Sequence, residues 1–206
     1  MRPVTRPDYT GMLYANYKSY LKPLITNFGG YCSYCEQEDK LDVEHVAPKS
    51  KNPHLIVDWD NLLLGCPRCN RDFKKSNNDN RNGYVWPDTD NTFKLLKYFE
   101  DGRVKAQSNL DNLTKDKVKN TIKLVCLDDS QQPQAPLNLT RRRKFKIAKL
   151  AKTKYLDEHQ TLEEILLQAE DGHWSVWVTV FYDIDVVREA LTTRQAYPNT
   201  VLERAM

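Results

Sequence analysis

The segments YCSYCEQEDKLDVEHVAPKS (31–50) and WDNLLLGCPRCNRDFKKS (59–76) determine the fold of this chain. They contain two Cys-x-x-Cys pairs, made by Cys32, Cys35, Cys66 and Cys69. Each pair can present two thiolates from a tight turn, and four thiolates form the tetrahedral site of a structural zinc ion. The alternative is four buried cysteines that act as small apolar side chains, but two such pairs rarely arise by chance. The long gap between the pairs leaves room for an inserted functional segment.

Beside these pairs lie four polar residues with the chemistry of a metal-dependent nuclease centre: Glu44, His45, Asn61 and Asn70. Phosphodiester hydrolysis needs an activated water molecule, a neutralised phosphate and a stabilised leaving oxygen. A neutral imidazole can accept a proton from water near pH 7, and oxygen ligands suit a hard divalent cation. Each residue alone has a simpler explanation as a surface, turn or helix residue, so the prediction depends on the combination.

The combination resembles the HNH endonucleases, which form the ββα-metal class of nucleases. Their pattern is an acid–His pair, a central Asn and a final His or Asn on a helix, often framed by two zinc-binding Cys pairs. It covers about residues 31–76 of this chain. The resemblance implies that His45 is the general base and that Asn61 orients it. It also implies that Glu44 and Asn70 hold one catalytic Mg²⁺ or Mn²⁺, distinct from the Zn²⁺ of the cysteines.

Glu44 departs from the commonest form of the family, in which many members carry Asp at this position. Adjacent residues of a regular strand point to opposite faces of the sheet. Glu44 and His45 can therefore serve one site only where the strand bends or ends, and Pro48 with the loop after it favours such an end. Asp42 and Asp72 are reserve candidates for the catalytic metal.

The hydrophobic pattern places this motif on a strand at 40–46, a loop at 50–60, a strand at 61–65 and a short helix at 68–76. The other expected elements are a helix at 9–28 with a candidate kink at Pro23, a loop at 77–92, a hairpin at 93–99 and 103–107, a helix at 115–127 capped by Thr114, a Gln/Pro linker at 128–137, and a long helix at about 139–169. Residues 174–182 are rich in Val and Trp, as strands are, but their context favours a helix.

These elements predict an α+β fold in which a ββα-metal HNH nuclease core with structural zinc is embedded in a mainly helical domain. We expect an N-terminal helical segment (1–30), the zinc core (31–78), a hairpin-and-helix extension (79–137) and a C-terminal helical region with a basic helix (138–206). A chain of 206 residues can bury a substantial core. A composition of 40% apolar and 29% charged residues is that of a globular chain and excludes a disordered one.

The chain has no apolar run near the roughly 20 residues that a membrane helix needs. Its first residues, MRPVTRPD, lack the apolar segment of a signal peptide. We therefore expect a cytoplasmic protein without a membrane partner, in a compartment where reduced thiols favour metal binding over disulfides. Cys126 falls on the apolar face of a predicted helix, so we expect it in the core.

A net charge of +3 is too small to establish a nucleic-acid partner, but the distribution of charge is informative. Four basic residues lie within or just after the second cysteine pair, and we expect them to contact nucleic-acid phosphates: Arg68, Arg71, Lys74 and Lys75. A second basic run at 141–154 contains no acid. For that run a solvated helix, a nucleic-acid contact and a partner-docking surface are equally good interpretations.

The wider sequence is similar to the HNH nuclease subunits of bacterial Septu-type and retron-associated anti-phage defence systems (PtuB-like). The similarity is carried by YCSYCE (31–36), VEHVAPKS (43–50), WDNLLLGCPRCN (59–70) and WPD (86–88). It implies a defence nuclease that cuts DNA and works with an ABC-like ATPase partner subunit (PtuA-like). The C-terminal half carries no signature of its own.

A second class of function stays open, namely a non-catalytic, zinc-stabilised module that binds nucleic acid or scaffolds a complex. The four polar residues favour the metal-dependent endonuclease, because a binding module has no need of a general base beside metal ligands. Loss of cutting in a folded His45→Ala variant would separate the two.

Overall fold

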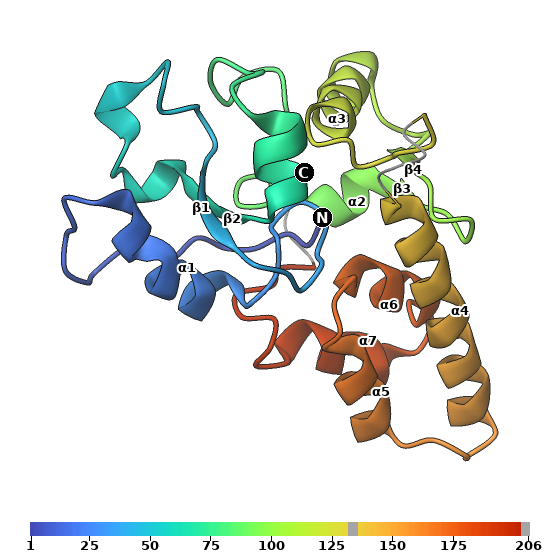
Figure 1. Ribbon diagram of the computed structural model, residues 1–206. Coiled ribbons are helices and arrows are strands. Elements are labelled where there is room, and N and C mark those ends of the chain that lie inside the picture. The colour runs from blue at the N-terminus through green and yellow to red at the C-terminus, as the bar shows by residue number, and fades with distance from the viewer. Residues whose placement is uncertain (132–135, 203–206) are drawn as a thin grey trace.

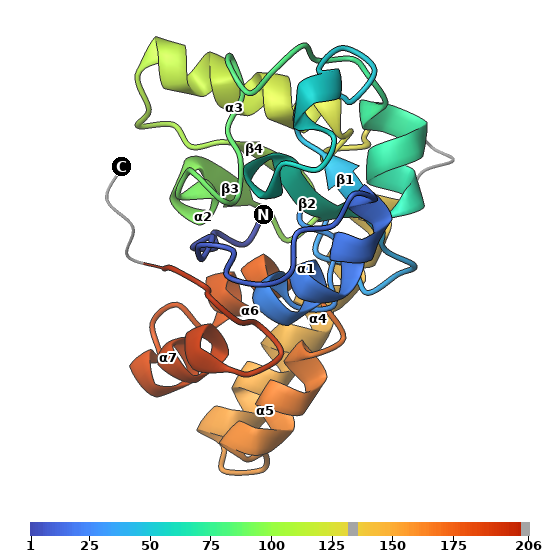
Figure 2. The ribbon, with the colours of Figure 1, turned by 90° about the vertical axis from the view of Figure 1, so that its left-hand side faces the viewer.

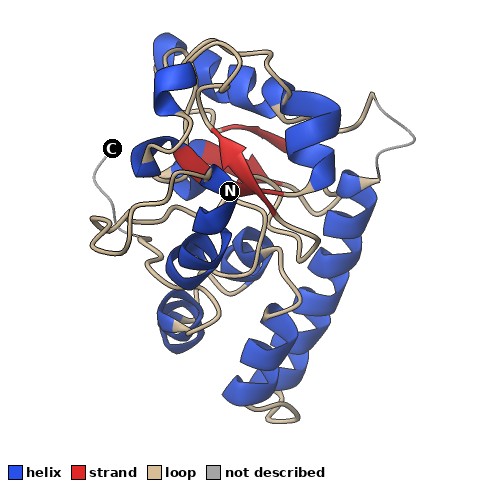
Figure 3. Cartoon of the chain, turned by 60° about the vertical axis from the view of Figure 1, so that its left-hand side comes forward, coloured by secondary structure: helices blue, strands red, loops and turns tan. Residues whose placement is uncertain are grey.

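The computed structural model describes residues 1–131 and 136–202 (Figure 1). Two small antiparallel sheets lie at the centre of this part, and helices surround them (Figure 3). One sheet pairs β1 (Asp42–His45) with β2 (Leu62–Gly65), and the other pairs β3 (Leu96–Tyr98) with β4 (Val104–Ala106). The helical segment η4 (Arg68–Lys74) follows β2 directly. The predicted α+β fold and its strand–loop–strand–helix core are therefore confirmed.

The sheet of β1 and β2 forms the centre of the site. All four residues of β2 are buried, which explains why this strand reads as an unbroken apolar run. Glu44 pairs with Leu63, and His45, the last residue of β1, pairs with Leu62. The intervening loop contains two short helical turns, η2 (Pro53–Leu55) and η3 (Trp59–Asn61).

The N-terminal helix is shorter than the sequence predicts. Only η1 (Tyr17–Tyr20) and α1 (Leu21–Phe28) are helical, whereas residues 9–16 are not. Pro23 falls in the first turn of α1, where a missing N–H removes no helical hydrogen bond, so it marks the start of a helix and not a kink. Gly29, at φ +80°, ends α1 in a conformation that glycine adopts readily.

The hairpin forms later in the chain than predicted because α2 (Thr92–Leu95) precedes it. The side chain of Asn91 accepts a hydrogen bond from Lys94 N at 3.2 Å and so starts this short helix. Gly102 makes the turn between β3 and β4 at φ +91°, where a Cβ atom would lie 1.9 Å from Asn138 O. Only glycine therefore lets the hairpin pack against the helix α4 (Leu137–Leu156), which carries Asn138.

Helix α3 (Asn112–Leu124) begins and ends about three residues before its predicted bounds. Asp111, and not Thr114, is its N-cap, because the Asp111 carboxylate accepts a hydrogen bond from Thr114 N at 3.0 Å. The predicted linker at 128–137 lies partly outside the described residues.

The long helix predicted at 139–169 is two helices, α4 (Leu137–Leu156) and α5 (Leu162–Ala169). Thr161 and Glu164 form a capping box that starts the second helix. Glu158, at φ +60°, lies in the turn between them. The preference for a helix at 174–182 is confirmed by α6 (Trp174–Val180), which is followed by α7 (Asp185–Thr193).

One hydrophobic cluster runs through both sheets and the helices α1 to α7, and it includes the fully buried Trp174 and Trp177. Helix α3 lies on one side of the two sheets, and α5 and α7 lie on the other (Figure 2). Within residues 1–131 and 136–202, no helix combines the length and apolar character of a membrane span.

Candidate active site and metal centre

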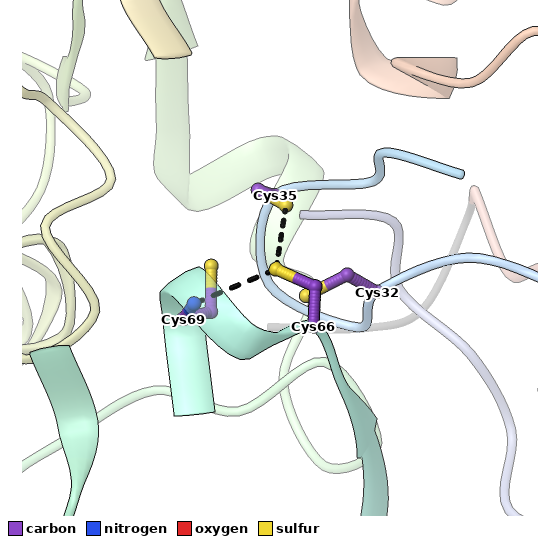
Figure 4. Close-up of side chains that lie close together, drawn as sticks. All are labelled: Cys32, Cys35, Cys66 and Cys69. Carbon is purple, nitrogen blue, oxygen red and sulfur yellow. Dashed lines mark hydrogen bonds between the residues drawn. The ribbon is translucent and has the colours of Figure 1, made fainter. Parts of the chain in front are cut away.

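The four cysteines of the two pairs converge on one buried point (Figure 4). Their sulfur atoms all lie within 4.8 Å of one another, and the Cys35 and Cys66 sulfurs are 3.7 Å apart. Thiolates about 2.3 Å from a tetrahedral ion would be about 3.8 Å apart. The donor set and its spacing therefore fit a structural zinc site.

Local structure brings the two halves of this cluster together. The first pair lies on a turn before β1, and Ser33 N donates to Leu64 O at 2.9 Å, which ties that turn to β2. The second pair starts η4, where Cys69 N donates to Cys66 Sγ at 3.4 Å. Hydrogen bonds from Cys32 and Cys35 lower the pKa of Cys66, whereas hydrogen bonds within the cluster, together with burial, raise the pKa values of Cys35 and Cys69. The neighbouring thiols thus stabilise the thiolate form of Cys66.

A hollow of about 680 Å³ opens beside this cluster, over the edge of β1 and η4. Glu44, His45 and Asn70 all line it, so the structure brings three of the four predicted site residues to one place. Adjacent residues of a regular strand point to opposite faces. Because β1 ends at His45, both Glu44 and His45 can reach the same hollow. Asp42 also lines it, whereas Asp72 does not.

His45 is held in a defined orientation. Its Nε2 lies 2.9 Å from Ile56 O. A carbonyl oxygen only accepts hydrogen bonds, so Nε2 carries the proton of the neutral ring and Nδ1 keeps the basic lone pair. The Tyr17 ring packs edge-on against the imidazole at 4.8 Å. Burial lowers the pKa of His45, and the charges of Lys49 and Lys74 lower it further. The ring is therefore neutral at pH 7, as a general base must be.

Among the described residues, no hydrogen bond joins Asn61 to the ring of His45. The side chain of Asn61 instead forms hydrogen bonds with the surrounding loops. Its Oδ1 accepts a hydrogen bond from Ala47 N at 2.8 Å. Its Nδ2 donates to Ala47 O at 3.0 Å and to Leu55 O at 3.2 Å. The buried amide thus joins the chain just after His45 to the chain just before Ile56, the acceptor of the imidazole proton. This geometry is that of a positioning residue.

Glu44 is accompanied by two side chains whose roles the sequence analysis missed. Lys74 is fully buried, and its Nζ lies 2.7 Å from Glu44 Oε1 and 2.8 Å from His45 O. Tyr34 Oη donates to the same Oε1 at 3.2 Å. Burial raises the pKa of Glu44, while Lys74 and Tyr34 act in the opposite direction. A sequence signal did exist, because Lys74 falls one helical turn after Asn70 and so lies on the same face of η4.

The four basic residues of η4 and its end separate into two kinds. Lys74 is buried and Arg68 holds the end of α3, where it donates to Cys126 O at 2.7 Å and to Val125 O at 3.3 Å. The burial of Lys74 contradicts the expected phosphate contact of that residue, whereas the contact expected of the partly exposed Arg68 stays a prediction. Arg71 and Lys75 are exposed and line the hollow. Lys49 and Lys18, which the sequence analysis did not single out, line it as well.

Four of the eight basic residues in the run at 141–154 are bound by partners within the chain. Arg141 is buried and donates to Leu127 O at 3.1 Å and to Gly102 O. Three lysines of the run form ion pairs with acids of other elements: Lys144 with Asp171, Lys149 with Glu100 and Lys152 with Asp183. Much of this run thus attaches α4 to its neighbours.

The fold and this site define a class of protein. Residues 32–76 match the family model described as HNH endonuclease, so the chain carries an HNH endonuclease domain. Over 107 residues the chain is 36% identical to the Septu protein PtuB of Bacillus thuringiensis. That match covers 47% of this chain and 41% of the relative, so it spans about two fifths of the relative's length.

Proposed function

We propose that this chain is a metal-dependent endonuclease that hydrolyses phosphodiester bonds of DNA. The observation that carries the proposal is the orientation of His45, whose Nε2–H is bound by Ile56 O, so that Nδ1 is left as the base on a hollow lined by Glu44 and Asn70. A zinc-stabilised binding module would need neither a fixed tautomer nor oxygen ligands beside it.

In the proposed reaction His45 Nδ1 accepts the proton of a water molecule as that water attacks the scissile phosphate. Glu44 and Asn70 would hold one Mg²⁺ or Mn²⁺ through oxygen atoms. When bound, this ion polarises the phosphate and stabilises the 3′ leaving oxygen. Asn61 keeps the base in place through Ala47 and Leu55, and Arg71 and Lys75 offset the charge of neighbouring phosphates.

Zinc in the four-cysteine cluster has a separate role in this proposal. A closed set of four sulfur ligands has no open position for substrate, so this ion stabilises the fold and takes no part in the reaction. The cluster fixes both ends of the segment that carries Glu44, His45 and Asn61, because Cys35 precedes β1 and Cys66 follows β2.

Supercoiled plasmid incubated with the purified chain and Mg²⁺ or Mn²⁺ tests the activity. We expect nicked or linear product with the wild-type chain and none with His45→Ala. His54→Ala is the matched control, because His54 is an exposed histidine of the neighbouring η2 and does not line the hollow. EDTA should stop cutting, and added Mg²⁺ should restore it. Cutting that survives His45→Ala in a folded protein would refute this assignment of the base.

We further propose that the chain serves as the nuclease of an anti-phage defence complex, together with an ABC-like ATPase subunit. Similarity to a Septu protein supports this assignment over about half of the chain. Co-expression with an ATPase encoded beside the gene should yield a stable complex on size-exclusion chromatography. Phage protection that requires both chains and is lost in His45→Ala would support the proposal, and protection without the ATPase would refute it.

A further inference from the structure

A chain of connected hollows leads away from the proposed active site. The hollow that contains His45 shares Lys75 with a second one of about 540 Å³, which is lined by Phe73, Tyr84 and Lys123 among others. That second hollow shares Phe73 and Lys123 with a third, of about 770 Å³, between α3 and β4. These shared residues make one continuous groove from the reactive residues to the outer face of α3, which lies beside η4 (Figure 1).

The groove is edged by lysines on both of its sides. Lys115, Lys119 and Lys123 recur every four residues along α3, so they form a stripe on one face of the helix. Lys105 faces them from β4. Three acids lie close by. Asp116 pairs with Lys119 at 3.1 Å on the exposed surface, Asp72 lines the second hollow and Asp128 lines the third. The balance of charge along the groove is positive.

The floor of the groove is apolar and aromatic. Phe73 lies in both outer hollows, with the Arg68 guanidinium over its ring at 4.7 Å. The floor continues through Ile122 of α3 to Val104 and Ala106 of β4. Lysines along the edges and aromatic groups on the floor are the two features with which proteins hold a nucleic-acid strand, because phosphates bind the cations and sugars and bases pack on the rings.

We infer that this groove is a DNA-binding channel that holds the strand flanking the scissile phosphate, from Lys75 past Lys123 to the lysine stripe of α3. The inference rests on the proposed endonuclease function and extends its substrate contacts beyond the HNH domain at residues 32–76. The stripe from Lys115 to Lys123 is about 12 Å long at about 1.5 Å per residue, which corresponds to three or four phosphates at about 3.4 Å per step. The channel therefore distinguishes long DNA from short DNA.

Binding by the full chain in the His45→Ala background tests the channel separately from cleavage. The double variant Lys119→Glu/Lys123→Glu should lose tenfold or more in affinity for a duplex of roughly 30 base pairs, and should lose less for one of roughly 8, because the shorter duplex makes fewer phosphate contacts along the stripe. The slope of log affinity against log salt should fall by about 0.9 for each phosphate contact removed.

Arg143→Glu/Lys146→Glu is the matched control, because it reverses two exposed charges on α4, outside the three hollows. Both double variants change only exposed positions and should unfold at the wild-type temperature. A channel predicts that the control stays within twofold of the parent chain for both duplexes. Equal losses in the two double variants would overturn the channel, since they would reflect net charge alone. Unchanged affinity in Lys119→Glu/Lys123→Glu would also overturn it.

Discussion

Lys74 Nζ lies 2.7 Å from Glu44 Oε1, and both side chains are closed off from solvent. The ammonium group comes from η4, and the carboxylate comes from β1. A single buried ion pair therefore joins the helix that carries Asn70 to the strand that carries His45. It also gives Glu44 a cationic partner of its own in addition to the divalent ion that we propose.

This pair leads to the first prediction. Lys74→Met leaves the Glu44 carboxylate buried without its partner, which typically costs about 3–5 kcal/mol of the free energy of unfolding. Lys75→Met is the matched control, because Lys75 is the exposed neighbour and should change stability by less than about 0.5 kcal/mol. Urea denaturation measures both. The double variant Lys74→Met/Glu44→Gln should recover stability and stay inactive, and a Lys74→Met chain as stable as wild type would contradict this account.

Asn61 provides the second prediction. Asn61→Ala removes three hydrogen bonds and leaves the buried Ala47 N–H without an acceptor, at a cost of about 1–3 kcal/mol. Asn61→Asp keeps the acceptor for that N–H but places a carboxylate oxygen against two carbonyl groups, so it should not restore stability. Denaturation curves give the energies, and plasmid cutting at fixed metal concentration should fall in both variants. Full activity in Asn61→Ala would show that the loops hold His45 without this amide.

The cysteine cluster provides the third prediction. Purified protein should contain one zinc per chain, and Cys66→Ser should lose both the metal and cooperative unfolding. Cys126→Ser is the control, since Cys126 is buried but stands outside the cluster, and this variant should keep its zinc. Elemental analysis by mass spectrometry, together with circular dichroism, gives both readouts. Well-folded wild-type protein without zinc would contradict the assignment.

The fourth prediction concerns acid stability. Asp88 is buried between two arginines, and Arg6 Nη2 and Arg81 Nη2 each lie 2.8 Å from its Oδ2. Burial alone would raise the pKa of Asp88, but hydrogen bonds and charge from Arg81 and Arg6 hold it below its ordinary value. The native pKa is thus lower than the unfolded one of about 3.9. The stabilisation is therefore complete above the unfolded pKa and is lost as the pH falls through the native one.

The Asp88→Asn variant tests whether this carboxylate makes stability fall as the pH is lowered. The variant should be less stable than wild type at pH 7, and the difference in free energy of unfolding should narrow at pH 3 and below. Asp79→Asn is the control, because Asp79 pairs with Lys51 on the exposed surface and should cost little at either pH. If the difference in free energy of unfolding between wild type and Asp88→Asn stays constant from pH 7 to pH 2, this carboxylate is ruled out as a source of acid sensitivity.

The residues that could be predicted from sequence are those whose signal is local. Cysteine spacing predicts a metal cluster, and the apolar run before Cys66 predicts a buried strand. The break between α4 and α5 also has a local sequence signal, because Thr161 and Glu164 have the spacing of a capping box. However, the apolar positions on both sides of the break continue one helical period. That longer pattern led to a single predicted helix.

The roles of the basic residues could not be predicted, because a lysine or arginine looks the same in sequence whether it is solvated or enclosed. Lys74 and Arg141 are buried by elements from distant parts of the chain, and their acceptors include Glu44 and the carbonyl of Leu127. Such contacts depend on tertiary packing. The lysine stripe of α3 does not stand out in the sequence, because Lys115, Lys119 and Lys123 are separated by other residues and share a face only once the helix forms.

The helical segment η4 also determines where this protein can gain or lose residues. Cys69, Asn70 and Lys74 stand within two turns of one helical segment, each with a different neighbour to reach. One inserted residue would rotate every later side chain by about a quarter of a turn, and Lys74 would then point away from Glu44. The loop between β1 and β2 is less constrained at its outer tip, where Pro53 and His54 are exposed. Changes in length among related chains should therefore accumulate at that tip, while the spacing from Cys69 to Lys74 stays fixed.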